Sequence, residues 1–300
     1  MNVEKRATCH GHQDCIYTVA GFAGSRLFYT AGADGMVVQW NLDAPDQGEV
    51  VAKVGNTIYA LCPVGDEQLI VGQNFEGIHQ IDLRSRQQVR SLKLTDAAIF
   101  DIQLLDGLLF VACGDGSVTV VDMEQWQTIT RFRPSEQSAR TIAINAAWKE
   151  FAVGYSDNSI RVFSLENRSL KYALTHHTNS LFSLTYSPDG LFLMSGGRDA
   201  HLRQWSVADN YALVQDIIPH MYTVNHILFR ADGKYFATCS KDKSIRIWDA
   251  ASLKPLTTIN KANNAGHGTS VNKLLWADDA TLVSVSDDRS VSIWKLNFTE

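Results

Sequence analysis

Short apolar segments alternate with clusters of glycine, aspartate and asparagine along the whole chain of 300 residues. The segments are rich in valine, isoleucine, phenylalanine and tyrosine, as in IFDIQLLDGLLFVACGDGSVTVVDM, residues 99–123. Apolar runs of about four to eight residues between turn-forming residues are typical of β-strands. No long stretch shows the period of an amphipathic helix. The pattern therefore predicts an all-β protein built from short strands and tight turns.

These segments repeat with a regular spacing. One position holds tryptophan in four repeats and another apolar residue in three, and its members are Trp40, Ile81, Val121, Phe163, Trp205, Trp248 and Trp294. Successive members are 40 to 46 residues apart, and each interval contains about four strand-like segments. A period near 40 to 45 residues with four strands per unit is typical of a propeller blade. The spacing therefore predicts seven copies of one four-stranded unit.

Four residue types keep fixed positions in repeats 1, 5, 6 and 7. A histidine lies 21 or 22 residues before an aspartate, a serine or threonine lies four before it, and a tryptophan lies six after it. The sets are His12, Thr30, Asp34 and Trp40; His177, Ser195, Asp199 and Trp205; His220, Thr238, Asp242 and Trp248; and His267, Ser284, Asp288 and Trp294. We expect each set to form a buried hydrogen-bonded network at one end of its unit. A catalytic His-Asp-Ser system would not be expected in four copies.

The period, two Gly-His pairs and the dipeptide Trp248-Asp249 resemble those of the WD-repeat β-propeller family. The resemblance covers the whole chain and is weak only in the middle three repeats. It implies an all-β, seven-bladed β-propeller forming a single domain over residues 1–300. Because few residues follow Trp294, we expect residues 1–9 to supply the missing outer strand of the last blade. That strand would close the ring and cover an exposed sheet edge.

Composition and motifs restrict the possible functions. The net charge of −5 and the pI near 6.0 give no electrostatic signature of nucleic-acid or membrane binding. The sequence has neither a signal peptide nor a membrane-spanning run, so we expect a cytoplasmic protein. The five cysteines include no CxxC pair and are expected to be reduced packing residues. No nucleotide-binding, serine-hydrolase or zinc-protease motif is present, and we expect no cofactor, metal or catalytic residue.

In a propeller, the first strand of each blade lines the central channel. The residues expected at its entrance are Tyr17, Tyr59, Phe100, Ile142, Phe182, Asn225 and Asn272. Four aromatic side chains at one opening are more apolar surface than solubility favours. Arg198 and Lys241, which directly precede turn aspartates, are expected beside the entrance, opposed by Asp287. Aromatic and basic residues together are typical of peptide-binding surfaces, although rings that only plug the channel would give the same sequence.

These observations predict a non-catalytic scaffold or adaptor that binds protein or peptide partners at the channel entrance. The expected contact residues are Tyr17, Tyr59, Phe100, Phe182, Arg198, Asn225, Lys241 and Asn272. The partner is expected to carry an acidic group beside an anchor residue, and the protein itself to be a monomer. The alternative is a small-molecule-binding or enzymatic propeller that uses the central channel. Unpaired acids or histidines would favour it, and the seven entrance positions contain neither.

One insertion is also informative. The approach to the last repeat, INKANNAGHGTS over residues 259–270, accounts for the longest spacing between repeats. It is rich in asparagine and glycine, so we expect a mobile loop on the same face as the aromatic entrance.

Overall fold

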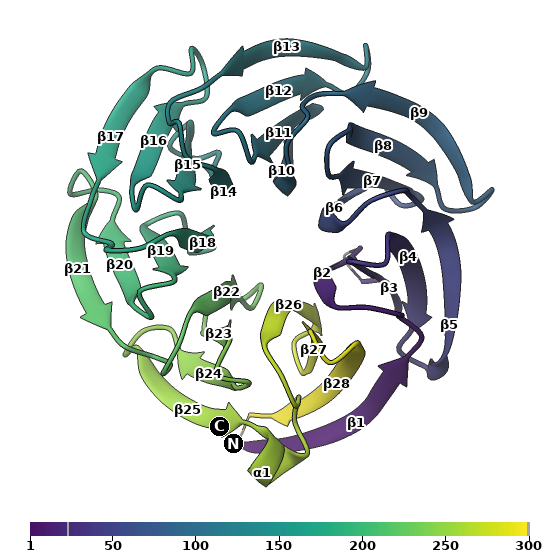
Figure 1. The fold of residues 1–300 in the computed structure, drawn as a ribbon. Helices are drawn as coiled ribbons and strands as arrows, with labels where there is room; N and C mark the ends of the chain where they lie inside the picture. Colours follow the sequence, from purple (N-terminus) through teal and green to yellow (C-terminus); the bar gives the residue numbers. More distant parts are fainter. Residues whose placement is uncertain (23, 299–300) are drawn as a thin grey trace.

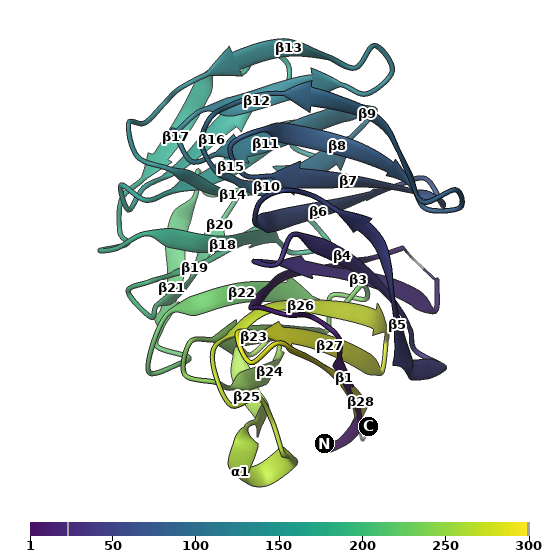
Figure 2. The same ribbon diagram turned by 45° about the vertical axis from the view of Figure 1, so that its right-hand side comes forward.

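The computed structural model describes residues 1–22 and 24–298. Within them, the strands form seven four-stranded antiparallel sheets arranged as the blades of a closed ring (Figure 1). The predicted all-β, seven-bladed β-propeller is confirmed. Figure 2 shows the same ring obliquely, with the blades stacked side by side around the central axis.

Blades 1 to 6 follow one another along the chain, and each runs from the innermost to the outermost strand. Blade 1 contains β2 (Ile16–Gly21), β3 (Leu27–Gly32), β4 (Met36–Asn41) and β5 (Ala44–Lys53); blade 2 contains β6 (Ile58–Val64), β7 (Gln68–Gln73), β8 (Gly77–Asp82) and β9 (Gln87–Lys93); blade 3 contains β10 (Ile99–Leu105), β11 (Leu108–Cys113), β12 (Val118–Asp122) and β13 (Gln127–Phe132). Blade 4 contains β14 (Ala139–Asn145), β15 (Glu150–Tyr155), β16 (Ile160–Ser164) and β17 (Leu170–Leu174); blade 5 contains β18 (Leu181–Tyr186), β19 (Phe192–Gly197), β20 (Leu202–Ser206) and β21 (Ala212–Ile217); blade 6 contains β22 (Val224–Phe229), β23 (Tyr235–Ser240), β24 (Ile245–Asp249) and β25 (Lys254–Ile259).

Blade 7 combines both ends of the described chain. Its inner strands are β26 (Val271–Asp278), β27 (Thr281–Ser286) and β28 (Ser290–Asn297), and its outer strand is β1 (Asn2–His10). The β1–β28 pairing runs antiparallel from Asn2 opposite Asn297 to His10 opposite Ser290. The expected closure by the N-terminal strand is confirmed. Because β28 would otherwise be an unpaired edge, β1 removes the only break in the ring of described blades.

The apolar core lies between blades. Each pair of neighbouring blades shares one cluster of buried side chains, so the described residues form seven such clusters around the ring. In the cluster between blades 7 and 1, for example, Val285 and Ile293 pack with Phe28 and Trp40. Each blade therefore depends on both neighbours, and the inner strands that line the channel are held from two sides.

The approach to blade 7, which is expected to be a mobile loop, includes a short regular element. It contains one turn of helix, α1 (Lys261–Asn264), whose N-cap Asn260 accepts a hydrogen bond from the Asn263 amide at 2.9 Å. The Lys5 ammonium of β1 donates to the Ala265 carbonyl oxygen at 2.7 Å. Figure 1 places α1 at the outer edge of the ring, beside β1 and away from the channel. Its mobility stays a prediction. Within the part of the chain described, no helix has the length and apolar character needed to cross a bilayer.

Candidate partner-binding site at the channel entrance

The four sets of histidine, hydroxyl, aspartate and tryptophan each form one connected chain of hydrogen bonds. In blade 6, His220 Nδ1 lies 3.0 Å from Asp242 Oδ2 and His220 Nε2 lies 2.8 Å from Thr238 Oγ1. The Trp248 indole donates to the same hydroxyl at 2.9 Å. The equivalent distances in blades 1, 5 and 7 lie between 2.8 and 3.2 Å. The structure thus brings together all four sets. We call the face of the ring that carries them the tetrad face.

The donors in this network fix the protonation of the histidine. The Trp248 N–H can only donate, so the Thr238 hydroxyl accepts it and gives its own proton to His220 Nε2. The Nδ1–H then donates to Asp242. Burial lowers the pKa of His220, although Asp242 acts in the opposite direction, so the ring is neutral. Burial alone would raise the pKa of the Asp242 carboxyl, but hydrogen bonds from His220 and Ser244 hold it well below its usual range. The Thr238 hydroxyl proton is already donated to His220, so it is not free for catalysis, and we interpret the network as structural.

Blades 3 and 4 keep the acidic turn but replace the histidine with a hydroxyl residue. Thr95 Oγ1 donates to Asp115 Oδ2 at 3.1 Å, and Ser135 Oγ donates to Asp157 Oδ2 at 2.7 Å. Arg161 adds an ion pair with Asp157 at 2.8 Å. These substitutions explain why repeats 3 and 4 lack the sequence signature and still fold as blades.

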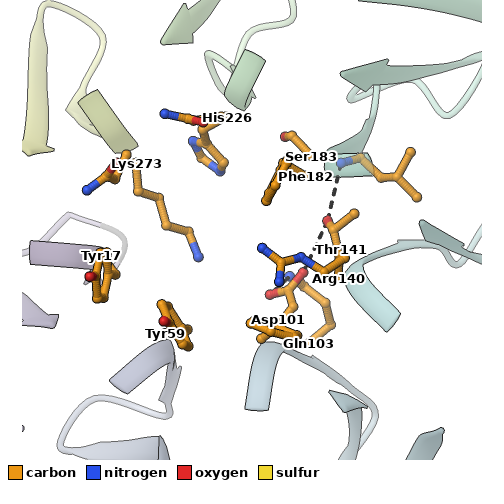
Figure 3. Close-up of a pocket in the computed structure, with 14 residues that line it drawn as sticks. Tyr17, Tyr59, Asp101, Gln103, Arg140, Thr141, Phe182, Ser183, His226 and Lys273 are labelled. Carbon is orange, nitrogen blue, oxygen red and sulfur yellow. Dashed lines mark hydrogen bonds between the residues drawn. The ribbon is translucent and has the colours of Figure 1, made fainter. Parts of the chain in front are cut away.

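Three aromatic rings line one side of the channel entrance. The ring centroids of Tyr17 and Tyr59 are 4.8 Å apart, and those of Tyr59 and Phe100 are 5.3 Å apart. They come from consecutive inner strands, β2, β6 and β10, and Figure 3 shows the two tyrosines pointing into the same space. We call Tyr17, Tyr59 and Phe100 the aromatic arc.

The fourth expected aromatic residue, Phe182, does not continue this arc directly. The Arg140 guanidinium lies between it and Phe100, with its central carbon 3.8 Å from the Phe100 ring centroid and 4.6 Å from that of Phe182. Such stacking is a cation–π arrangement on both faces of one guanidinium. The expected continuous aromatic wall is therefore interrupted by a cation.

The expectation for blade 4 was wrong, because Arg140 and not Ile142 occupies the entrance. Ile142 is only 1% exposed, and its backbone amide donates to Asp101 Oδ2 at 2.8 Å. The inner strand β14 starts at Ala139 and has a register shift before Thr141, as the other inner strands do after their first residue. Because β14 begins with the small Ala139 and the charged Arg140, a search for apolar residues places the start of the strand too late.

The distance to the turn aspartate identifies Arg140 as the entrance residue of blade 4. Tyr17 lies 17 residues before Asp34, and Arg140 lies 17 residues before Asp157.

The entrance leads into a cavity of about 290 Å³ in the channel. All of the aromatic arc, Arg140 and Phe182 line it, together with Asn225 and Asn272. One step deeper it is lined by Asp101, His226 and Lys273, which the sequence analysis did not identify (Figure 3). We call this space the channel cavity.

A ladder of hydrogen bonds joins the inner strands just below the entrance. In it, one side chain of each blade accepts a backbone N–H from the next blade. The pairs are Asp101 with the Ile142 amide at 2.8 Å, Thr141 with Leu184 at 3.2 Å, Ser183 with Ile227 at 2.9 Å, and His226 with Leu274 at 3.2 Å. The ladder runs from blade 3 to blade 7 and fixes the inner strands relative to one another.

Lys273 occupies the next position in this ladder but cannot accept a hydrogen bond. Its side chain extends into the channel instead, as Figure 3 shows. On the far side of this break, Thr18 Oγ1 in blade 1 is buried without a hydrogen-bond partner. Lys273 therefore brings an ammonium group into the channel cavity at the position where blades 3 to 6 each supply a hydrogen-bond acceptor.

The two entrance asparagines are engaged between blades. Asn225 Nδ2 donates to Ser270 Oγ at 2.9 Å and to the Val271 carbonyl oxygen at 2.8 Å. Asn272 Nδ2 donates to the Ile16 carbonyl oxygen at 2.8 Å and to Asp287 Oδ1 at 2.7 Å. Their amide donors hold blades 6, 7 and 1 together, which leaves fewer groups on this side of the entrance for a ligand.

Arg198 and Lys241 lie at the rim and are not among the residues that line the channel cavity. Their backbone amides bond to the carbonyl oxygens of Ser180 at 2.8 Å and Thr223 at 3.2 Å, just before the inner strands begin. Arg198 still acts on the entrance through its charge. Burial is the main reason that the pKa of Arg140 falls to about 10, and Arg198 lowers it further. The cations inside the cavity are therefore Arg140 and Lys273.

An exposed apolar loop lies on the tetrad face of blade 6. Ile218, Met221 and Tyr222 are 67%, 81% and 58% exposed, and they flank the buried His220 in the connection from β21 to β22. The Met221 amide donates to Asp242 at 3.2 Å, and Ser240 Oγ donates to the Tyr222 carbonyl oxygen at 3.4 Å. A fixed backbone that displays large apolar side chains is typical of an interaction surface.

The acid and the histidine inside the channel bear on the alternative of an enzyme. Asp101 accepts hydrogen bonds from the amides of Ile102 and Ile142, so each carboxylate oxygen has a partner. Burial, and then the charge of Lys273, lower the pKa of His226 to about 3, and its Nδ1 accepts the Leu274 amide. Both residues serve the ladder between blades. Among the described residues, no group of three or more histidine, cysteine or acidic side chains is placed to hold a metal ion.

Comparison with protein families agrees with this architecture. The family model described as WD domain, G-beta repeat, matches residues 3–41, 168–206, 212–249 and 254–295. These segments together cover more than half of the chain. The chain belongs to the WD40-repeat family. Each matched WD40 segment begins in or just before the outer strand of one blade and ends in the third strand of the next, for example from β21 to β24. The unmatched repeats are blades 2 to 4, which lack the tetrad histidine.

The curated proteins to which the chain is similar are about twice as long. The chain is 24% identical over 295 residues to the 66 kDa stress protein of Physarum polycephalum, covering 96% of this chain and 47% of that protein. It is 24% identical over 298 residues to WD repeat-containing protein 1-B of Xenopus laevis, with 96% and 48% covered. It is 23% identical over 290 residues to actin-interacting protein 1 of Drosophila melanogaster, with 95% and 46% covered. The chain thus spans about half the length of these curated relatives.

Proposed function

We propose that this WD40 chain is a non-catalytic scaffold that binds a protein or peptide partner on the tetrad face, with the channel entrance as the centre of the contact. The observation that carries the proposal is the aromatic arc with Arg140, which places three rings and a stacked guanidinium at one opening. Aromatic and arginine side chains dominate binding hot spots. The Asp101 and His226 side chains are used between blades, which argues against a catalytic channel.

The surroundings favour a macromolecular partner. A cavity of about 290 Å³ accepts a side chain or a short terminus but no larger part of a protein. Beyond it, the exposed loop with Met221 and Tyr222 leads directly into β22, whose Asn225 lines the cavity. A partner that inserts one side chain could therefore rest its neighbouring residues on this loop. Arg198 and Lys241 at the rim would then act mainly on the rate of association.

The names of the relatives suggest the first partner to test. One curated relative is called actin-interacting protein 1 in Drosophila melanogaster, and another has the same name in Caenorhabditis elegans. We include actin as a candidate partner, and a cytoplasmic monomer as the form in which the chain would meet it. The net charge of −5 supports neither nucleic acid nor an anionic membrane as the partner.

The test is quantitative affinity capture from native lysate, together with co-sedimentation with purified actin filaments. The wild type is compared with Tyr17→Ala, Phe100→Ala and with a control double variant, Val89→Ala, Ile129→Ala, which removes two exposed apolar side chains from the outer strands β9 and β13. We expect the entrance variant to lose a defined set of partners that the control retains. Identical capture by all three proteins would refute a binding site at the entrance.

A further inference from the structure

The channel cavity contains two cations that nothing in the structure neutralises. Among the described residues, neither the Lys273 ammonium nor the Arg140 guanidinium makes a hydrogen bond or an ion pair with another protein group. The buried Arg203, by contrast, bonds both Asp199 at 2.9 Å and Asp216 at 3.0 Å. Charged groups withdrawn from water are normally paired because desolvation is costly. The two channel cations are exceptions to this rule, and an anionic ligand in the cavity would supply the missing partner.

The charged groups around Arg140 and Lys273 do not balance the two positive charges. Asp101 is the acid that lines the cavity, and its two oxygens are occupied by the amides of Ile102 and Ile142. His226 beside Lys273 has its pKa lowered to about 3 and is neutral at physiological pH. Arg140, with a pKa of about 10, is still protonated there. The cavity thus has a positive excess in a chain whose net charge is −5.

The arrangement of Arg140 limits what it can bind. Phe100 and Phe182 cover the two faces of its guanidinium, at 3.8 and 4.6 Å from the ring centroids. Only the edge, with its N–H donors, is left for a ligand. That edge matches the two oxygens of a carboxylate, and Lys273 supplies a point charge from another blade (Figure 3). The rings of Tyr17 and Tyr59 would pack against the apolar stem that carries the carboxylate.

We propose that the channel cavity receives a carboxylate of the partner polypeptide, held by the edge of Arg140 and by Lys273, with its stem against Tyr17 and Tyr59. The inference rests on the proposed function and goes beyond it by naming the ligand group and its two receptors. A carboxylate fits better than a phosphorylated side chain. Asp101 lines the same cavity, and it would repel the additional negative charge that a phosphate group carries compared with a carboxylate. The carboxylate comes either from an aspartate or glutamate side chain or from the C-terminus.

Four libraries of acetylated random hexapeptides distinguish these sources. Three have an amidated C-terminus and a fixed central residue, which is glutamate, glutamine or phosphoserine, with no other acidic position. The fourth has a free C-terminal carboxylate and no acidic residue. Peptides retained by the immobilised protein are quantified by mass spectrometry. We expect the wild type to retain the glutamate library, the free-carboxylate library or both at least about tenfold more than the glutamine library.

Three variants test the receptors, and the melting temperature of each is measured first to show that it is folded. Lys273→Met and Arg140→Met should each reduce retention of the favoured library by about tenfold or more. Arg140→Lys keeps the charge without the planar edge and should bind more weakly than the wild type. Lys234→Met, an exposed lysine outside the cavity, is the control and should bind as the wild type does.

The outcomes separate the two proposals. Equal retention of the glutamate, free-carboxylate and glutamine libraries, lost in Tyr59→Ala, Phe100→Ala, would overturn the carboxylate inference and leave the proposed binding site intact. Preference for the phosphoserine library would overturn the choice of carboxylate. Retention of no library by the wild type would overturn both proposals. Unchanged binding by Lys273→Met and Arg140→Met would show that other groups receive the carboxylate.

Discussion

The guanidinium carbon of Arg140 lies 3.8 Å from the ring centroid of Phe100, within a stack that Phe182 completes. The two residues come from the inner strands β14 and β10 of neighbouring blades, which face the centre of the ring. Burial lowers the pKa of Arg140 to about 10, so folding disfavours its charged form. A charge that costs stability at an exposed opening is more readily explained by binding than by folding.

This cost can be measured by replacing Arg140 with methionine. Arg140→Met keeps apolar contact with both rings and removes the desolvated charge, so we expect the free energy of unfolding to rise by about 1 kcal/mol. Arg203→Met is the matched control. Arg203 pairs with two aspartates, and its loss removes the ion pair of the buried Asp199 carboxylate, so we expect a decrease of about 3 kcal/mol. Urea unfolding of the two variants gives both values, and a decrease of similar size for both would contradict this reading of Arg140.

The tetrad of blade 6 gives a second prediction. Asp242→Ala removes the acceptor of His220 Nδ1 and of the Met221 amide, so we expect it to lower the free energy of unfolding by about 1 to 3 kcal/mol. Lys243→Ala, in the same turn, should have almost no effect, because Lys243 is exposed and its positive φ of 72° is equally unfavourable for alanine. Chemical denaturation compares the two variants. Equal destabilisation would show that the tetrad does not stabilise the blade.

Stability should fall as the pH is lowered below neutrality. Burial lowers the pKa values of His12, His177 and His220, and that of His226 to about 3. The unfolded chain, with histidine pKa values near about 6.5, binds protons that the folded chain does not. Each histidine therefore stabilises the fold above its unfolded pKa, and this contribution is lost as the pH falls from about 6.5 toward the folded pKa.

Replacing His226 isolates one part of this effect. Gln at this position can still accept the Leu274 amide but does not titrate. Between about pH 6.5 and pH 5, the free energy of unfolding of the wild type should fall by up to about 2 kcal/mol more than that of His226→Gln. Urea unfolding at several pH values measures the difference. A parallel decline in both proteins would mean that His226 is protonated as readily in the folded state as in the unfolded one.

Much of this architecture follows from residues that repeat. The tryptophan position and the tetrads predict seven blades, because the same contacts must recur wherever the same four side chains stand at the same spacing. Ring closure follows from the same count, since β28 needs a partner strand. Sequence periodicity thus predicts well whatever depends on contacts within a single blade.

The channel cavity could be predicted only in part, because its residues are not repeated. Tyr17, Tyr59, Phe100 and Phe182 were identified from their place after the first apolar residue of a strand. Arg140 escaped this rule because blade 4 begins with alanine. Lys273 could not be identified from the sequence, because its role becomes visible only beside the ladder between blades. Asp101 and the three residues that follow it in the ladder all accept a hydrogen bond, whereas Lys273 cannot. The ladder uses a different side chain in each blade, so it leaves no repeated residue in the sequence.

The closing strand gives a further prediction. Removing residues 1–9 should cause aggregation or a large loss of stability, because it exposes the β28 edge and removes the Lys5 contact with Trp294, whose ring centroid lies 5.3 Å from the ammonium. Size-exclusion chromatography and thermal melting measure this effect. A circular permutant with residues 1–10 placed after residue 300 through a short Gly-Ser turn should recover a monomer, because β1 runs antiparallel to β28. A truncated chain that melts like the wild type would refute ring closure as a source of stability.

The last prediction concerns the aromatic arc and the charged rim, which should affect partner binding differently. Tyr59→Ala, Phe100→Ala removes two adjacent rings and should weaken partner binding by about 2 kcal/mol or more, as truncation of hot-spot residues does. Its melting temperature should fall only slightly, since both side chains line the cavity and lie outside the seven buried clusters. Arg198→Glu, Lys241→Glu reverses two rim charges and should slow association and change its salt dependence, with a smaller effect on dissociation. Surface plasmon resonance at two salt concentrations separates these rates. Full affinity in both double variants would mean that the rings only plug the channel and that partners bind elsewhere on the propeller.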